Sequence, residues 1–390
     1  MSKPRIAILG AGPVGLEAAL AAVEGGYPFT IYEAAPSAGG NVRSWGHVRM
    51  FTPWDLNVSP RMRRRIEAPS GSECPTGQEL AERLLDPIAT LRDIAPNLRL
   101  GTRVLSLGRE GLLKHEEIAN VERGRRPFRI LLSDGDREWT DRADVVIDAT
   151  GTYGNPNRLG DAGIPAPGER SLESEIRRQI PDFTREASDW AGKTVLLAGA
   201  GHSAQTAVRE LARLAQETPG TRVVWVLRNP EPDWGTHEGD PLPERARLAA
   251  EAESLASGAS PAVEVRRGMA IEELSRPNGK IEVTLRNGSG SETVAVDRVL
   301  SLTGFVGDHE LYRQLQVHEC YATCGPIKLS AALLGAAAGD CLAQTSHGAE
   351  TLMNPEPGFF ILGIKSYGRN NTFLMRVGWD QVAEVFGTLG

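Results

Sequence analysis

Three glycines near the start of the chain have the spacing of a loop that binds phosphate groups. Gly10, Gly12 and Gly15 stand between an apolar run and an alanine-rich segment, so we expect a strand, a tight turn and a helix. The first glycine permits the turn, the second lets a pyrophosphate approach the backbone, and the third lets the helix pack closely on the strand. The helix would offer free N–H groups and the positive end of its dipole to the phosphates, and Pro13 and Val14 belong to the same predicted site.

An acidic residue completes the pattern of a dinucleotide site. Glu33 ends the next apolar run, where its carboxylate can accept hydrogen bonds from the two hydroxyl groups of a ribose. Gly39 and Gly40 follow, which suits a second close approach of the backbone to the diphosphate of FAD. The first forty residues therefore predict bound FAD, and the alternative is a glycine turn in an ordinary βαβ unit.

A second glycine loop occurs in the middle of the chain. Gly199, Gly201 and Ala204 follow the strand-like run at 193–198, and alanine is an accepted variant at the third position. The next apolar run ends on Arg228, where the first loop has an acid. Because a guanidinium matches a phosphate with two parallel hydrogen bonds, Arg228 favours NADPH, with its 2′-phosphate, over NADH. The alternatives are that Arg228 pairs with a surface carboxylate and that NADH is the coenzyme.

Further cofactor contacts are expected where other strands and helices begin or end. These residues are Thr150 and Gly151 after a buried strand, His202 and Ser203 at the start of the second helix, Gly363 after the last strand and Thr372 at the start of the last helix. His202 could touch the pyrophosphate or the nicotinamide, or it could simply fill the loop. A helix starting near Thr372 would direct its free amide groups at the pyrimidine edge of a flavin.

Two other groups of residues have side chains that could bind a ligand or react, but they form no known motif. His47, Arg49 and Trp54 lie in an aromatic and charged segment after the first glycine pair, and we name them as pocket candidates. The alternative for that segment is a loop packed by its aromatic side chains. Cys320 and Cys324 have three residues between them, which fits no common redox or zinc spacing, so a redox pair is one open alternative. No catalytic acid or base can be named, and no metal site is predicted.

The composition is that of an ordinary globular protein. The chain has 390 residues, enough for two or three domains, with 41% hydrophobic and 24% charged residues. A net charge of −7 gives no reason to expect a nucleic-acid partner, and no apolar window is long enough to span a membrane. The first strand begins almost at the first residue, leaving no room for a signal peptide, and the four cysteines are too few for a disulfide framework. We therefore expect a cytoplasmic protein.

The order of strands and loops predicts an α/β fold with two Rossmann-like dinucleotide-binding domains, the second inserted in the first. The runs at 144–151 and 297–304 share the order acid, apolar strand and Thr-Gly, so we infer that the chain crosses between domains at both. We expect an FAD-binding domain at 1–155 and 305–390 and an NAD(P)H-binding domain at 156–304. A short helix is expected near 171–180.

These motifs together resemble the two-dinucleotide-binding-domain flavoproteins, and among them most the flavin-containing monooxygenases with their N-hydroxylating and Baeyer–Villiger relatives. The resemblance implies FAD contacts at Gly10, Gly12, Gly15, Glu33 and Gly40, and NADPH contacts at Gly199, Gly201, Ser203 and Arg228. It implies an FAD-dependent NADPH oxidoreductase. The specific expectation is a monooxygenase that acts on a small-molecule substrate through a flavin peroxide.

The chain departs from these relatives in three places. The monooxygenase signature F-x-G-x-x-x-H is absent from 157–192. The last strand ends in Gly363-Ile364-Lys365, where many relatives carry Gly-Asp to hold the ribityl chain. No cysteine pair follows Gly39 and Gly40, and the middle domain has no C-x-x-C, which argues against a disulfide reductase of the usual kinds. Two alternatives therefore stay open: a reductase that passes electrons to a quinone or protein acceptor, and a non-catalytic regulatory protein that binds nucleotides.

Overall fold

A parallel sheet is built around the strand that precedes the first glycine loop. β1 (Ile6–Leu9) lies between β2 (Phe29–Tyr32) and β7 (Val145–Asp148), with β3 (Leu98–Arg99) and β16 (Phe359–Ile361) at the two edges. Every neighbouring pair is parallel, so the carboxyl ends of all five strands meet at one edge of the sheet. In a sheet of this kind, that edge is where ligands bind.

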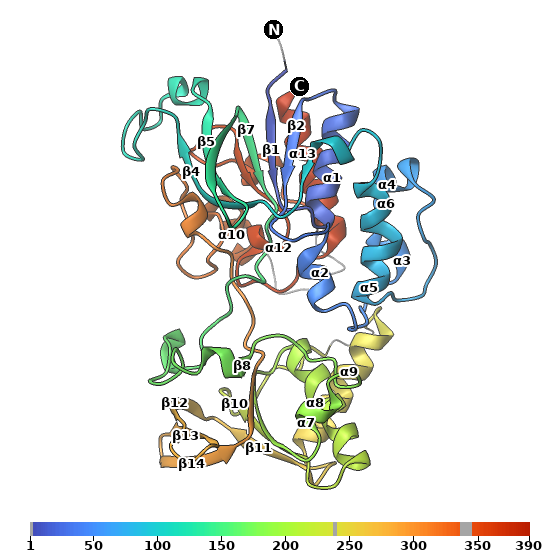
Figure 1. Ribbon diagram of the computed structural model, residues 1–390, viewed down its shortest axis with the longest axis vertical. Coiled ribbons are helices and arrows are strands. Elements are labelled where there is room, and N and C mark those ends of the chain that lie inside the picture. Colours follow the sequence, from blue (N-terminus) through green and yellow to red (C-terminus); the bar gives the residue numbers. More distant parts are fainter. Residues whose placement is uncertain (1–2, 237–239, 336–344) are drawn as a thin grey trace. The chain divides into compact units, whose positions relative to one another are not determined.

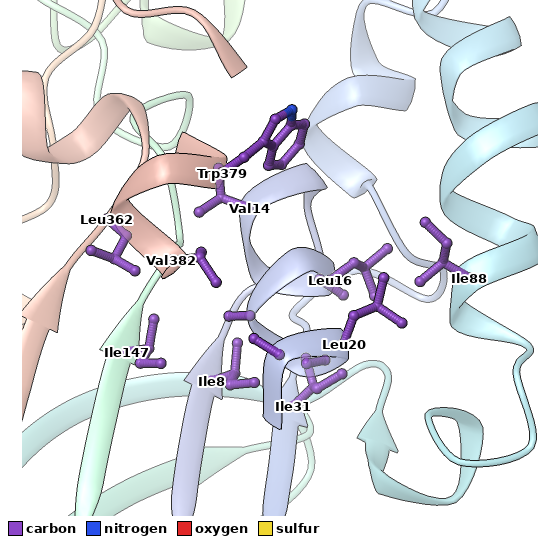
Figure 2. Close-up of a cluster of buried hydrophobic side chains, with 14 of the residues drawn as sticks. Ile8, Val14, Leu16, Leu20, Ile31, Ile88, Ile147, Leu362, Trp379 and Val382 are labelled. Carbon is purple, nitrogen blue, oxygen red and sulfur yellow. The ribbon is translucent and has the colours of Figure 1, made fainter. Parts of the chain in front are cut away.

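Alternating side chains of the central strand enter two separate cores. Ile6 and Ile8 pack with helices on one face, whereas Ala7 and Leu9 pack on the other face against an antiparallel sheet of three strands. Figure 2 shows the helical side, where Ile8, Leu16 and Leu20 belong to one cluster with Val382 of the last helix. A strand that is apolar on both faces is typical of a sheet covered on both sides.

The computed structural model describes residues 3–236, 240–335 and 345–390 and divides into two compact units, Met1–Asn155 with Val306–Gly390 and Pro156–Phe305. The other α-helices of the first unit (Figure 1) are α1 (Pro13–Glu24), α2 (Gly40–Ser44), α3 (Trp54–Asn57), α4 (Pro60–Arg65), α5 (Gly77–Leu80), α6 (Asp86–Ala89), α10 (Ile327–Gly335), α11 (Ala349–Leu352), α12 (Ile364–Tyr367) and α13 (Met375–Leu389). Its antiparallel strands are β4 (Arg103–Arg109), β5 (Phe128–Ser133) and β6 (Glu138–Ala143). Its short turns are the π-helical η1 (Ala81–Leu85) and the 3₁₀ turns η2 (Ala95–Asn97), η3 (Val121–Arg125) and η6 (Glu310–Tyr312).

The second unit repeats this plan around the second glycine loop. Its parallel sheet has the order β11 (Val263–Arg267), β10 (Arg222–Leu227), β9 (Thr194–Ala198), β15 (Arg298–Ser301) and β8 (Ile176–Arg177). The other elements are the 3₁₀ turns η4 (Asp161–Gly163) and η5 (Glu173–Glu175), the helices α7 (Ala187–Trp190), α8 (His202–Glu217) and α9 (Pro243–Ala256), and the antiparallel strands β12 (Ala270–Ser275), β13 (Ile281–Asn287) and β14 (Gly290–Val296). Val195 and Leu197 pack with α8 and α9, and Leu196 packs with the antiparallel strands.

The predicted α/β fold with two dinucleotide-binding sheets is confirmed. The short helix expected near 171–180 is wrong, because this stretch forms η5 and then β8, which pairs in parallel with β15. Among the residues that the structure describes, no helix is both long enough and apolar enough to cross a membrane.

A buried carboxylate supports the start of the second unit. Both oxygens of Glu169 accept the N–H of Leu159 (3.1 Å each), and Oε2 also accepts the N–H of Ala166 at 2.9 Å. Arg178 donates to Oε1 at 2.8 Å. Burial opposes ionisation of Glu169, but these hydrogen bonds outweigh it and hold the pKa of Glu169 below its ordinary value of 4.5.

Glu169→Gln is therefore expected to lower the free energy of unfolding at neutral pH by about 2 kcal/mol, the usual contribution of hydrogen bonds to a charged group. Since the folded-state pKa is depressed, the stabilisation by Glu169 is complete above pH 4.5 and is lost as the pH falls through the folded value. Urea unfolding followed from pH 7 to well below pH 4.5 should show a smaller loss of stability in the variant. Equal pH dependence in both proteins would contradict this role.

Candidate functional site

The first glycine loop connects β1 to α1, and its three glycines meet different constraints. Gly10 has a φ of 96°, and a Cβ there would lie 2.8 Å from the carbonyl oxygen of Ala149. A Cβ on Gly15 would lie 1.9 Å from the carbonyl oxygen of Gly10, so only glycine lets the helix approach the turn. A Cβ on Gly12 would meet nothing within 4 Å. Gly12 is therefore the position where the backbone is open to a ligand.

The start of α1 is uncapped by the protein. Gly12 is the N-cap residue and has no side chain to accept a hydrogen bond, and Pro13 is the first helical residue. The amide groups of the first turn lie at the positive end of the helix dipole, which attracts phosphate oxygens. Gly12, Pro13 and Val14 all line a cavity of about 740 Å³ in the first unit.

Glu33 is fixed at the wall of this cavity by two backbone hydrogen bonds. Its Oε2 accepts the N–H of Ala11 at 2.7 Å, and its Oε1 accepts the N–H of Ala35 at 2.9 Å. Each carboxylate oxygen keeps a further lone pair, so the group can still accept a hydrogen bond from a ribose hydroxyl. Gly40 lies next to it, and a Cβ there would be 2.3 Å from the Cβ of Ala35. The close packing of α2 against this loop therefore requires a glycine.

Most of the residues predicted to contact FAD line the cavity together. They are Gly10, Gly12, Pro13, Val14, Glu33, Gly40, Thr150, Gly151 and Gly363. They come from the carboxyl ends of β1, β2, β7 and β16, which parallel pairing brings to one edge of the sheet. Gly15 does not line the cavity, and it packs against the backbone of Gly10 in the loop. The set fits an elongated dinucleotide with a diphosphate at the helix and a ribose at Glu33.

The three pocket candidates do not line this cavity. His47 and Arg49 are exposed, and Arg49 donates a hydrogen bond to the carbonyl of Cys74. Trp54 is 1% exposed and packs in the helical core, with the guanidinium of Arg83 5.1 Å from its ring centroid. From the same segment Trp45, Met50 and Thr52 line the cavity instead. Residue type identified the segment, but the backbone path decides which side chains turn inward.

The expected start of the last helix also needs correction. α13 begins at Met375 with Leu374 as its N-cap, three residues after Thr372. Thr372 donates its backbone N–H and its hydroxyl to Oδ1 of Asn370, at 2.9 and 2.7 Å, and this local turn competes with the helix. Thr372 is not among the lining residues, whereas Phe373, Leu374 and Met375 are.

A buried ion pair that the sequence did not reveal lies behind the cavity wall. Lys365 donates to Oδ2 of Asp148 at 2.6 Å and to the hydroxyl of Thr150 at 3.2 Å. The other carboxylate oxygen of Asp148 accepts the N–H and the hydroxyl of Thr150, at 3.1 and 2.7 Å. The side chains of Lys365 and Asp148 are 1% and 0% exposed. The lysine that departs from the relatives' pattern therefore orients Thr150, which does line the cavity.

One part of the cavity wall is aromatic. The rings of Trp45 and Tyr153 stack with their centroids 6.4 Å apart and an interplanar angle of 27°, and Phe373 lines the same cavity. Burial raises the pKa of the Tyr153 phenol, so this group stays neutral at physiological pH. The sequence contained a signal for Trp45 in its aromatic segment, but none for Tyr153.

The second glycine loop, between β9 and α8, has the geometry of the first. Gly199 has a φ of 126°, and a Cβ there would lie 2.2 Å from the carbonyl oxygen of Leu302. A Cβ on Gly201 would meet nothing within 4 Å, and Gly201 is the uncapped N-cap of α8. The indole of Trp225 donates to the carbonyl of Gly199 at 2.8 Å and fixes the turn. The open backbone at Gly201 corresponds to the open backbone at Gly12.

The other predicted coenzyme contacts lie at the same end of the second sheet. His202 and Ser203 form the start of α8, half-buried and exposed respectively. Arg228 directly follows β10 and is exposed. Because Leu227 pairs with Arg267 across parallel strands, Arg228 and Arg267 belong to the same sheet edge as the glycine loop. This edge therefore combines open amide groups with guanidinium groups.

Comparisons with known proteins agree with this geometry. The family model described as pyridine nucleotide-disulphide oxidoreductase matches residues 4–320. No curated protein matches the chain in sequence. The described residues contain no cluster of three or more His, Cys, Asp or Glu side chains that could hold a metal ion.

Solved structures of known enzymes share the fold at low identity. The chain is similar to bacillithiol disulfide reductase from Bacillus cereus, with a TM-score of 0.72 and 17% identity over 100% of this chain and 99% of that chain. It is similar to thioredoxin reductase from T. acidophilum, with a TM-score of 0.60 and 17% identity over 100% and 98% of the two chains. It is also similar to ornithine N-hydroxylase from Kutzneria sp. 744, with a TM-score of 0.63 and 14% identity over 100% and 99%.

The similarity to solved structures establishes the fold, and the match to the family model establishes the family to which the chain belongs. The matched residues include both glycine loops, Glu33 and Arg228. The resemblance to flavoproteins with two dinucleotide-binding domains is confirmed at the level of this family. The chain therefore belongs to the pyridine nucleotide-disulphide oxidoreductase family and is an FAD-dependent NAD(P)H oxidoreductase.

Proposed function

We propose that this enzyme uses NADPH to reduce FAD held in the first unit, and that the electrons then pass directly to a small-molecule acceptor. The proposal rests on the lining of the 740 Å³ cavity. Among the residues that the structure describes, no cysteine lines this cavity. Cys74, Cys320 and Cys324 are described and lie outside that lining. An acceptor that entered the cavity would therefore meet the cofactor without a protein dithiol between them.

The residues have distinct tasks in this proposal. The chemistry supplied by FAD would be acceptance of a hydride from the nicotinamide and onward transfer of the electron pair. The open backbone at Gly12 and the amide groups of α1 would hold the FAD diphosphate, and Glu33 would hold the ribose. Gly201 and α8 would hold the NADPH diphosphate, and Arg228 its 2′-phosphate.

Arg228→Ala is expected to weaken NADPH binding by about 10- to 100-fold, because hydrogen bonds to charged groups contribute about 1.5–3 kcal/mol. NADH binding should change by less than about 3-fold, since NADH lacks the phosphate. The measurement is the KM of flavin reduction for both coenzymes. Arg222→Ala is the matched control, because Arg222 is also exposed but begins β10 instead of following it. Equal losses for NADPH and NADH would contradict the assignment.

The direct route is tested by removing every cysteine. A variant with serine at Cys74, Cys320, Cys324 and Cys341 should reduce a quinone with NADPH at the same kcat as the parent, and the flavin should be reduced at the same rate. If flavin reduction is unchanged but quinone reduction is lost, electrons leave through a thiol and the proposal is wrong. Measuring the two half-reactions separately distinguishes this result from a folding defect.

Oxygenation of a small molecule is a second candidate, favoured by the aromatic wall of Trp45, Tyr153 and Phe373. Oxygenation requires that water be kept from the reduced cofactor, and an apolar wall can do this. The missing F-x-G-x-x-x-H signature argues for the direct reductase instead. Rapid mixing of the reduced enzyme with oxygen decides between them. Reoxidation in one phase supports the reductase, and a transient absorbing species before the oxidised spectrum supports oxygenation.

A further inference from the structure

Two successive carbonyl groups of the second glycine loop accept hydrogen bonds from buried side chains. The indole Nε1–H of Trp225, on β10, donates to the carbonyl of Gly199 at 2.8 Å. The side-chain amide of Gln205, on α8, donates through Nε2 to the carbonyl of Ala200 at 3.0 Å. Trp225 is 0% exposed and Gln205 is 1% exposed. Both carbonyls therefore point toward the interior of the second unit.

The direction of these carbonyls fixes the direction of the amide groups beside them. Both peptides are trans, and in a trans peptide the C=O and the N–H point to opposite sides. Because the carbonyls of Gly199 and Ala200 point inward, the N–H groups of Ala200 and Gly201 point outward. A Cβ on Gly201 would meet nothing within 4 Å, so this side of the loop is open. Two successive N–H groups that face outward from a turn form a concave site of the kind that binds anions.

The same side-chain amide also holds the segment that follows β10. Nε2 of Gln205 donates to the carbonyl of Trp234 at 3.1 Å. The ring of Trp234 packs against that of Trp225, with the ring centroids 5.5 Å apart. A Cβ on Gly235 would lie 3.4 Å from Nε2 of His202, so this segment passes beside the start of α8. Gln205 therefore ties the glycine loop to the chain beside it.

The first glycine loop uses its corresponding amide group differently. There the N–H of Ala11, at the position equivalent to Ala200, donates to the carboxylate of Glu33 at 2.7 Å. In the second loop Arg228 takes the place of that acid, and a guanidinium cannot accept a hydrogen bond from the N–H of Ala200. The two loops therefore share their shape but differ in what directs their amide groups.

We propose that Gln205 and Trp225 are positioning residues of the coenzyme site, which direct the N–H groups of Ala200 and Gly201 at the diphosphate of the coenzyme. The inference rests on the proposed function, because it takes the second glycine loop as the place where the coenzyme binds. It concerns the diphosphate, which NADPH and NADH share, and is separate from the recognition of the 2′-phosphate by Arg228. The two contributions can therefore be measured apart.

The test measures the Kd of NADP⁺, NAD⁺ and adenosine 2′-monophosphate by calorimetry on the oxidised holoenzyme. Adenosine 2′-monophosphate carries the 2′-phosphate but no diphosphate. Gln205→Met and Trp225→Phe should each weaken the binding of NADP⁺ and NAD⁺ about tenfold, because each variant misdirects one hydrogen bond to a charged group. The same variants should bind adenosine 2′-monophosphate as the parent does.

The two variants keep the size and the apolar contacts of the side chains that they replace. Methionine also removes Oε1 of Gln205, which is buried and accepts no hydrogen bond from the described residues. Circular dichroism establishes folding, and if one variant fails to fold, the other decides. Gln216→Met is the matched control, because Gln216 is exposed near the end of the same helix, and it should bind all three ligands as the parent does.

Arg228→Ala should give the opposite pattern, with weaker binding of NADP⁺ and adenosine 2′-monophosphate and unchanged binding of NAD⁺. If Gln205→Met and Trp225→Phe bind NAD⁺ as tightly as Gln216→Met, the proposed positioning role is wrong. If they weaken all three ligands equally, they disturb the whole unit and the proposal is also wrong. In both cases the Arg228→Ala pattern would still support the proposed function. A parent that binds neither NADP⁺ nor NAD⁺ would overturn both.

Discussion

Gly12→Asp is expected to yield a folded protein that no longer retains FAD. Gly12 has a φ of −77° and a ψ of −175°, which any residue can adopt, and a Cβ there meets nothing within 4 Å. Aspartate is also a favourable N-cap, so its carboxylate can accept the amide groups at the start of α1. The same carboxylate would occupy the place of the diphosphate and repel it.

The expected loss of FAD affinity is at least about 100-fold, because two unit charges 4 Å apart near a protein surface interact by about 4 kcal/mol. The measurement is the flavin content after purification and the Kd for added FAD, with circular dichroism to establish folding. Gly201→Asp is the matched variant, since Gly201 has the same open geometry and begins α8. It should keep FAD and lose NADPH. A Gly12→Asp protein that binds FAD normally would contradict the assignment of the first loop.

Lys365→Met is expected to destabilise the first unit by about 3–5 kcal/mol, the usual result when one partner of a buried ion pair is removed. Asp148, whose side chain is 0% exposed, would lose the cation that now lies 2.6 Å from its carboxylate. The hydroxyl of Thr150 would also lose its contact with the lysine. The measurement is urea unfolding followed by circular dichroism.

A second variant separates charge from packing. Asp148→Asn combined with Lys365→Met removes both charges while the asparagine oxygen can still accept hydrogen bonds from Thr150. The double variant should recover most of the lost stability, because an apolar replacement of a buried pair is often close to neutral. If the single and double variants are equally unstable, the loss comes from packing and the ion-pair account is wrong.

The features predicted correctly are those encoded by short stretches of sequence. A strand, a glycine turn and a helix follow one another within twenty residues, so their pattern predicted both the β1–α1 and the β9–α8 connections. The same holds for the strands at Val145–Asp148 and Arg298–Ser301, which repeat one pattern.

Features that depend on distant residues could not be predicted. Lys365 pairs with Asp148, which is 217 residues away in the sequence, and no feature of the sequence near Asp148 indicates a lysine partner. A helix is expected from the sequence near 171–180, but β8 forms there because it pairs with β15. The aromatic segment that begins at the end of α2 is a further example. The sequence could not show that Trp45 lines the cavity while Trp54 packs in the core.

The central claim is that the first unit holds FAD and that a hydride donor bound at the second glycine loop reduces it. Its most direct test is an anaerobic titration of the purified protein with NADPH, followed by visible absorbance, with Gly201→Asp measured beside it. We predict that the parent is yellow and that NADPH bleaches it, whereas Gly201→Asp is equally yellow but resists bleaching. A parent that stays colourless after incubation with FAD, or that stays yellow with excess NADPH, would contradict the claim.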